Sequence, residues 1–176
     1  MPRLFTGLEI PTDVSDTLER WQGGLPGARW IDPADFHLTL RFIGDIDAAT
    51  ANEIAECLEA IQPRRIGVTL EKLAVFGRDK PHSLVAQAAN TDSLTALQAE
   101  HERLMRRLGA PPETRKFAPH VTLARLRGVT PEAVANHIAL RGAFPRSAFQ
   151  PERFVLYSSR ESRGGGPYKV EVAYPL

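Results

Sequence analysis

The chain has 176 residues, 43 % of them hydrophobic, and its 22 basic residues nearly balance 21 acidic ones. The hydrophobic content excludes a disordered chain, and the net charge of +1 gives no overall attraction to nucleic acid. No hydrophobic run approaches the roughly 18–20 residues of a membrane-spanning helix. The single cysteine, Cys57, excludes an intrachain disulfide, and with an N-terminus that lacks signal-peptide features it favours a cytoplasmic protein.

The residue pattern predicts strands interleaved with helices. In chain order, we expect a strand at 3–10, a helix at 11–22, strands at 28–31 and 36–44, a helix at 48–61, strands at 66–76 and 84–89, a helix at 92–108 capped by Asp92 or Ser93, a strand at 119–128, a helix from 130, and strands at 154–158 and 168–174. Several neighbouring strands have no helix between them. This favours antiparallel or mixed sheets over a doubly wound parallel sheet.

Two of the predicted strands resemble each other. FHLTLRFIG at 36–44 and PHVTLARLRG at 119–128 both contain His-x-Thr-x with hydrophobic residues at the x positions, and they lie about half a chain apart. Alternate side chains of a strand share a face, so each histidine and threonine should point the same way. A duplication explains the pair, and a pseudo-twofold axis would bring the two strands together at a central cleft.

Two histidines and two threonines in one cleft suit displacement at phosphorus. Imidazole titrates near neutrality, so one histidine can accept a proton from an attacking group while the other donates a proton to a leaving group. Threonine hydroxyls and arginines can hold the non-bridging oxygens. If the substrate's own 2′-hydroxyl attacks, RNA is cleaved to a cyclic phosphate; if water attacks, a cyclic phosphate is opened.

A metal site is the competing explanation for two histidines. Asp35 lies on the same predicted face as His37, but Ala118 occupies the corresponding position before His120. Zinc hydrolases generally need three protein ligands, so we expect no metal and no other cofactor. A Ser-His-Asp triad is also unsupported, because no G-x-S-x-G turn is present.

The paired motifs resemble the two-histidine phosphoesterase superfamily, and most of all the bacterial RNA 2′,3′-cyclic phosphodiesterases, the LigT-like proteins once described as 2′–5′ RNA ligases. The resemblance extends over nearly the whole chain, through RLFTGLEIP, RWIDPADFHLTLRFIGDI, KFAPHVTLARLRG and FVLYSSRESRGGGPYKVEVAYPL. It implies an α+β, bilobal duplicated fold, with two antiparallel sheets around a central cleft and helices outside. Residues 1–176 would then form a single two-lobed domain with one motif per half, at 37–40 and 120–123.

The resemblance also implies an activity, namely metal-independent hydrolysis of a nucleoside or RNA-terminal 2′,3′-cyclic phosphate to the 2′-phosphate. His37 would protonate the departing 3′-oxygen, His120 would activate water, and Thr39 and Thr122 would bind phosphate oxygens. The pseudo-symmetry leaves the acid and base roles nearly exchangeable. Family members often place an arginine just after the second motif, where Arg125 stands.

Strand parity makes separate predictions for three residues that follow the two motifs. Arg125 follows His120 by five positions, so a regular strand would send it to the opposite face unless a strand end or a bulge redirects it. Arg41 has the parity of His37 and is a second candidate phosphate ligand on physical grounds alone. Phe42 falls on the hydrophobic parity and is expected in the core.

The expected partner is RNA with a 2′,3′-cyclic phosphate end or a small cyclic nucleotide, and a monomer suffices because the cleft needs only one chain. Two alternatives remain open: a 2′–5′ RNA ligase that uses the same residues in near reverse, and a non-catalytic binder of RNA ends or nucleotides. Candidate contacts to an RNA backbone are Arg115 and Lys116 before the second motif, and Arg160 and Arg163 in the loop at 158–168.

Overall fold

The computed structural model describes residues 3–159 and 166–176, which form nine strands and four α-helices. The strands are β1 (Arg3–Glu9), β2 (Ala28–Trp30), β3 (His37–Asp45), β4 (Val68–Phe76), β5 (Ser83–Ala88), β6 (His120–Leu126), β7 (Ser147–Phe149), β8 (Arg153–Ser159) and β9 (Lys169–Pro175). The helices are α1 (Thr12–Glu19), α2 (Ala48–Leu58), α3 (Asp92–Arg107) and α4 (Pro131–Arg141), with a 3-10 turn at Pro33–Asp35. The candidate RNA contacts Arg160 and Arg163 lie outside the described residues.

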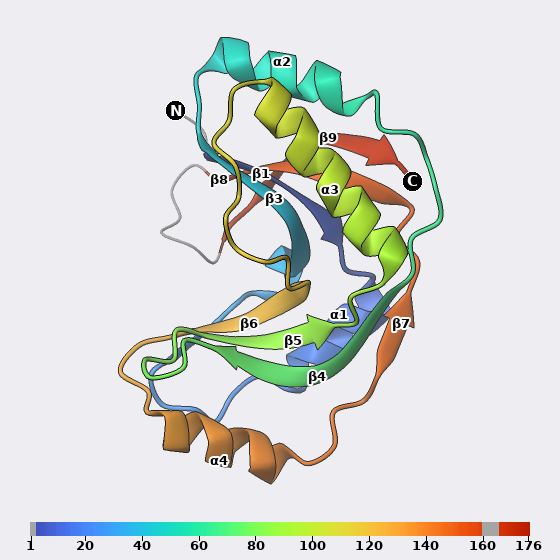
Figure 1. The fold of residues 1–176 in the computed structure, drawn as a ribbon. Coiled ribbons are helices and arrows are strands. Elements are labelled where there is room, and N and C mark those ends of the chain that lie inside the picture. The colour runs from blue at the N-terminus through green and yellow to red at the C-terminus, as the bar shows by residue number, and fades with distance from the viewer. Residues whose placement is uncertain (1–2, 160–165) are drawn as a thin grey trace.

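All paired strands are antiparallel, in the order β7-β4-β5-β6-β3-β1-β8-β9, and β2 pairs with β6. The two halves meet where β3 pairs with β6, at the single residue pair Leu38–Val121. The predicted duplicated α+β fold with antiparallel halves is confirmed, and the two expected sheets are continuous through this one pair. In Figure 1 one half contains β1, β3, β8 and β9 and is flanked by α2 and α3. The other half contains β4, β5 and β6, and α4 lies on its far side.

Local signals explain where most elements begin. Asp47 caps α2 by accepting a hydrogen bond from the backbone N–H of Thr50, and Thr130 caps α4, which has a proline in its first turn. The cap of α3 is Thr91, one position before the expected Asp92. Strand β7 was not expected, because three residues at a sheet edge are too few to show an alternating pattern. Within the described ranges, no helix is both long and hydrophobic enough to cross a membrane.

Strand β3 does not alternate regularly after its motif. Gly7 of β1 pairs with Thr39 and Thr6 pairs with Arg41, so Leu40 has no residue opposite it on β1. Such an extra residue is a β-bulge, and it reverses the face on which the following side chains lie. Leu40 and Arg41 are consequently both buried.

Strand β6 has the same irregularity at the same distance from its histidine. Val85 of β5 pairs with Thr122 and Leu84 pairs with Ala124, so Leu123 is the extra residue. Leu123 and Ala124 are both completely buried. The two motif strands therefore share a bulge as well as a sequence motif.

The bulges set the face of the sheet on which Arg125, Phe42 and Arg41 lie, and simple alternation predicted the wrong face for each. Arg125 is exposed, since the bulge returns it to the face of His120. Phe42 is 42 % exposed, so its expected place in the core is wrong for the same reason. Phe42 and Arg125 occupy corresponding positions in the two halves, five residues after their histidines.

Arg41 turns inward and is only 6 % exposed. Its guanidinium forms an ion pair with Glu102 of α3 and donates hydrogen bonds to the backbone carbonyls of Phe42 and Pro111, the latter at 2.6 Å. These partners occupy the groups that a phosphate would need. Arg41 lines the larger cavity beside His120, but its guanidinium is taken up by these protein partners, which favours a role in packing α3 and the following loop against β3 over phosphate binding.

Candidate active site

The two motif histidines begin the two central strands and are held in the same way. His37 Nδ1 lies 2.9 Å from the backbone oxygen of Asp35, and His120 Nδ1 lies 2.7 Å from that of Ala118. A carbonyl only accepts, so Nδ1 carries the proton in each neutral ring. Nε2 is then the nitrogen left for chemistry, and in His37 it lies 3.1 Å from Thr39 Oγ1.

Aromatic rings enclose His37 more fully than His120. The His37 ring centroid lies 4.8 Å from that of Phe5 and 4.9 Å from that of Tyr168, while His120 meets Phe76 edge-on at 4.6 Å. These rings remove water from the imidazoles, and loss of water disfavours the charged form.

Both histidine pKa values are lowered as a result. Burial lowers the pKa of His37 to about 4, opposed by the Asp35 carbonyl and assisted by the positive charges of His120 and Arg125. Burial also lowers the pKa of His120, again with help from Arg125. Both rings are neutral near pH 7 in the protein alone. A phosphate anion nearby raises both pKa values, because an opposite charge favours the protonated ring.

Two adjoining cavities lie along the motif residues. The smaller, of about 120 Å³, is lined by His37, Thr39 and Arg125 among others, and the larger, of about 340 Å³, reaches His120. Thr39 and Phe42 line both. The structure therefore brings four of the five predicted site residues, His37, His120, Thr39 and Arg125, to adjoining cavities.

Thr122 shares the half-buried state of Thr39 and follows His120 on its strand. Neither of the two cavities, as traced over the described residues, includes Thr122 in its lining. Ser83 of β5 lies opposite Arg125 of β6 and orients its guanidinium, because the Ser83 hydroxyl accepts a hydrogen bond from Arg125 Nη1 at 2.9 Å.

Sequence reasoning missed several residues that line these cavities. Phe42 was expected in the core, and Phe76 and His82 of the larger cavity carried no signal beyond their strand and turn pattern. Tyr168, in the smaller cavity, comes from a distant segment. The candidate RNA contacts Arg115 and Lys116 both line the larger cavity, and Arg115 is paired with Glu113.

The described part of the chain contains no group of three or more His, Cys, Asp and Glu side chains placed to hold a metal ion. The chemistry that this site can perform is proton transfer by two imidazoles, next to hydroxyl and guanidinium donors suited to an anion.

Comparison with known proteins agrees with this geometry. The sequence profile of the family described as "LigT like Phosphoesterase" matches residues 8–86 and residues 85–168, one motif in each. A protein of Aeropyrum pernix named RNA 2′,3′-cyclic phosphodiesterase is 37 % identical over 107 residues, 60 % of each chain. A protein of Aquifex aeolicus with the same name is 33 % identical over 135 residues, 71 % of each chain.

The fold comparison covers the whole chain. The crystal structure of E. coli LigT complexed with 3′-AMP superposes with a TM-score of 0.77 at 21 % identity, over 100 % of this chain and 99 % of that one. Fold and sequence together place the protein among the duplicated α+β phosphoesterases. Within that class, the chain belongs to the LigT-like phosphoesterase family.

Proposed function

We propose that the protein hydrolyses the 2′,3′-cyclic phosphate of an RNA end or a nucleoside to the 2′-phosphate, without a metal ion. The observation that carries the proposal is the pair of His-x-Thr strands meeting at the centre of the sheet, each with Nδ1 tied to a carbonyl. The name of the relatives, RNA 2′,3′-cyclic phosphodiesterase, supports the same reaction.

In the proposed reaction, His120 Nε2 takes a proton from water as the water oxygen attacks phosphorus. The bond between phosphorus and the 3′-oxygen breaks, and His37 Nε2 gives its proton to that oxygen. The products are a free 3′-hydroxyl and a 2′-phosphate; His120 then releases its proton to solvent and His37 Nε2 takes one up from solvent, which restores both groups for the next turnover. Because burial holds the pKa of His37 at about 4, the substrate's negative charge must raise it before His37 can act as the acid.

The phosphate would lie between the two halves of the site. Thr39 faces both cavities, and its hydroxyl and that of Thr122 are the proposed donors to the non-bridging oxygens. Arg125 adds a positive charge that Ser83 orients. Donors fixed in position before the reaction stabilise the charge that develops on phosphorus at little reorganisation cost.

The test is to incubate the protein with 2′,3′-cyclic AMP in EDTA and to identify the product by phosphorus NMR. We expect 2′-AMP to accumulate at the rate seen without EDTA. Formation of 3′-AMP would mean that the 2′-oxygen leaves instead. If a 5′-hydroxyl RNA is supplied and joined product dominates, the ligase alternative holds; binding without any turnover would establish the non-catalytic alternative.

Replacing Arg125 with methionine should weaken use of the substrate by about 10–100-fold in kcat/KM, because a charge-assisted hydrogen bond contributes about 1.5–3 kcal/mol. The bulge in β6 does not depend on this side chain, so the fold should persist. The measurement is kcat and KM on 2′,3′-cyclic AMP, with Arg127→Met as a control at an exposed position just beyond the strand. Equal kinetics for Arg125→Met and the control would remove Arg125 from the site.

A further inference from the structure

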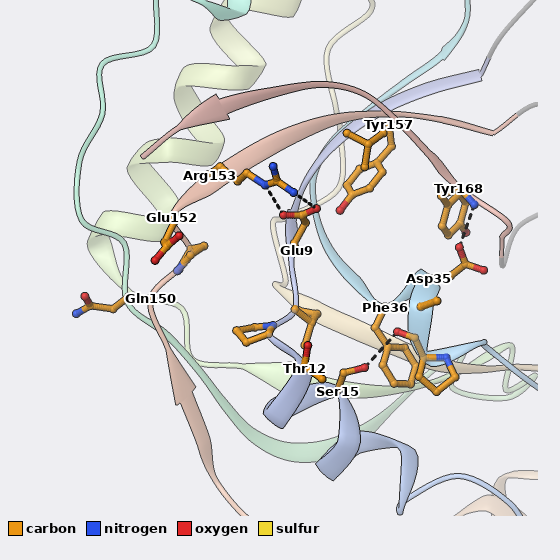
Figure 2. Close-up of a pocket in the computed structure, with 16 residues that line it drawn as sticks. Glu9, Thr12, Ser15, Asp35, Phe36, Gln150, Glu152, Arg153, Tyr157 and Tyr168 are labelled. Carbon is orange, nitrogen blue, oxygen red and sulfur yellow. Dashed lines mark hydrogen bonds and ion pairs between the residues drawn. The ribbon is translucent and has the colours of Figure 1, made fainter.

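A third cavity, of about 810 Å³, shares the wall residue Tyr168 with the smaller active-site cavity and is larger than both active-site cavities. Its wall includes Asp35, whose backbone oxygen holds His37, and Tyr157 and Tyr168, whose rings pack on the same imidazole. Neither motif histidine lines it. Figure 2 shows this cavity between the end of β1, the start of α1, and strands β8 and β9.

The wall of this cavity is negatively charged. Among the described residues that line it, the acidic ones are Glu9, Asp35 and Glu152 and the basic one is Arg153. The guanidinium of Arg153 is committed to Glu9, with Nε and Nη2 at 2.6 and 2.9 Å from the two carboxylate oxygens. The Asp35 carboxylate accepts a hydrogen bond from the Tyr168 backbone N–H at 3.0 Å, and this neutral donor leaves the negative charge of Asp35 in place. A cation is therefore the favoured occupant.

A second feature points independently to a ligand. Tyr157 is only 6 % exposed, and its hydroxyl points into the cavity, as Figure 2 shows. None of the hydrogen bonds within the described residues involves this hydroxyl, and the oxygen is open to the cavity rather than fully enclosed, so a ligand in the cavity can reach it. Burial raises the pKa of the phenol, so the hydroxyl stays protonated and can both donate and accept.

The distribution of the carboxylates identifies the kind of cation. No three acidic or histidine side chains of the described residues converge on a point, so the wall does not form a metal site. The three carboxylates come instead from the end of β1, from the 3-10 turn and from the segment before β8. An extended molecule with several ammonium groups can reach separated carboxylates, and the tyrosine rings attract ammonium groups as well.

We propose that this cavity binds an aliphatic polyamine, with one ammonium group hydrogen-bonded to the Tyr157 hydroxyl and others paired with the carboxylates of Asp35 and Glu152. Tyr168 lines both this cavity and the smaller active-site cavity. The polyamine site and the phosphate site thus share a wall and take ligands of opposite charge.

The test is calorimetric titration of the full chain with spermidine, in the absence of any nucleotide. We expect saturable binding of one spermidine, weakened about threefold to tenfold by Tyr157→Phe, which removes one hydroxyl and keeps the ring against His37. Glu152→Gln, at an exposed position, should weaken it to a similar extent. The matched control is Glu132→Gln, an exposed carboxylate in the first turn of α4, which should leave the affinity unchanged.

The proposal is overturned by no saturable binding, by equal affinity in Tyr157→Phe and the wild type, or by magnesium binding with the same dependence on Tyr157 and Glu152. Spermidine binding that is lost in Arg125→Met would also overturn it, because that residue belongs to the phosphate site. The titration uses no cyclic phosphate, so its outcome is independent of whether the protein hydrolyses one.

Discussion

Replacing His37 or His120 with alanine is expected to lower kcat for 2′,3′-cyclic AMP by about 10²–10⁴-fold, the usual contribution of one general acid or base. Each replacement removes the Nε2 that is proposed to move a proton, while the strand and its neighbours keep their partners. KM should change much less than kcat, because the loss arises in the transition state. The measurement is steady-state kinetics, with circular dichroism and thermal unfolding to verify the fold.

The double replacement adds a sharper criterion. Two groups that transfer protons in one step act as a unit, so the double variant should lose much less than the product of the two single losses. His137→Gln is a suitable control, since His137 lies on α4 outside the cavities and packs near Trp30. If either motif variant folds and turns over like the wild type, the paired-histidine mechanism is wrong.

Replacing Arg41 with methionine is expected to reduce the free energy of unfolding by about 3–5 kcal/mol, because it leaves the mostly buried carboxylate of Glu102 without its charged partner. The side chains of this pair are 7 % and 20 % exposed. Glu102 also accepts a hydrogen bond from the backbone N–H of Glu113, so the loop that leads to β6 should loosen as well. Urea unfolding measures the change.

The chain offers a matched control and a rescue. Arg146 and Glu71 form a pair whose side chains are 69 % and 41 % exposed, and Arg146→Met should cost at most about 1 kcal/mol. In the double variant Arg41→Met, Glu102→Leu, much of the stability should return, because no unpaired charge remains. The folded Arg41→Met protein should keep its kcat. A large fall in kcat without loss of stability would instead return Arg41 to the phosphate site.

The sequence was enough to predict most of the elements and the centre of the site. The His-x-Thr pair stood out because both copies alternate correctly, and the strands that carry them are the two that adjoin in the sheet. Arg125 was predicted by resemblance, against simple parity. Parity failed for Arg41 and Phe42 because a bulge is a relation between two strands: which residue lacks a partner depends on β1, at Thr6 and Gly7.

The aromatic residues that surround His37 could not be predicted from the sequence either, because they too depend on contacts between distant strands. Tyr157 and Tyr168 reach the imidazole only because β8 and β9 fold back beside β1, more than a hundred residues later in the chain. Nothing in the local pattern of either tyrosine differs from that of an ordinary strand residue. The large cavity lined by Tyr157 and Tyr168 depends on the same long-range arrangement.

The matched bulges in β3 and β6 bear on the origin of the molecule. The bulges fall at the same position in both halves, three residues after the histidine, at Leu40 and at Leu123. The simpler history is that one ancestral half already had the bulge and was copied with it. Before the two copies were fused, such a half would have completed its site by pairing with a second identical chain across the contact that now joins Leu38 to Val121.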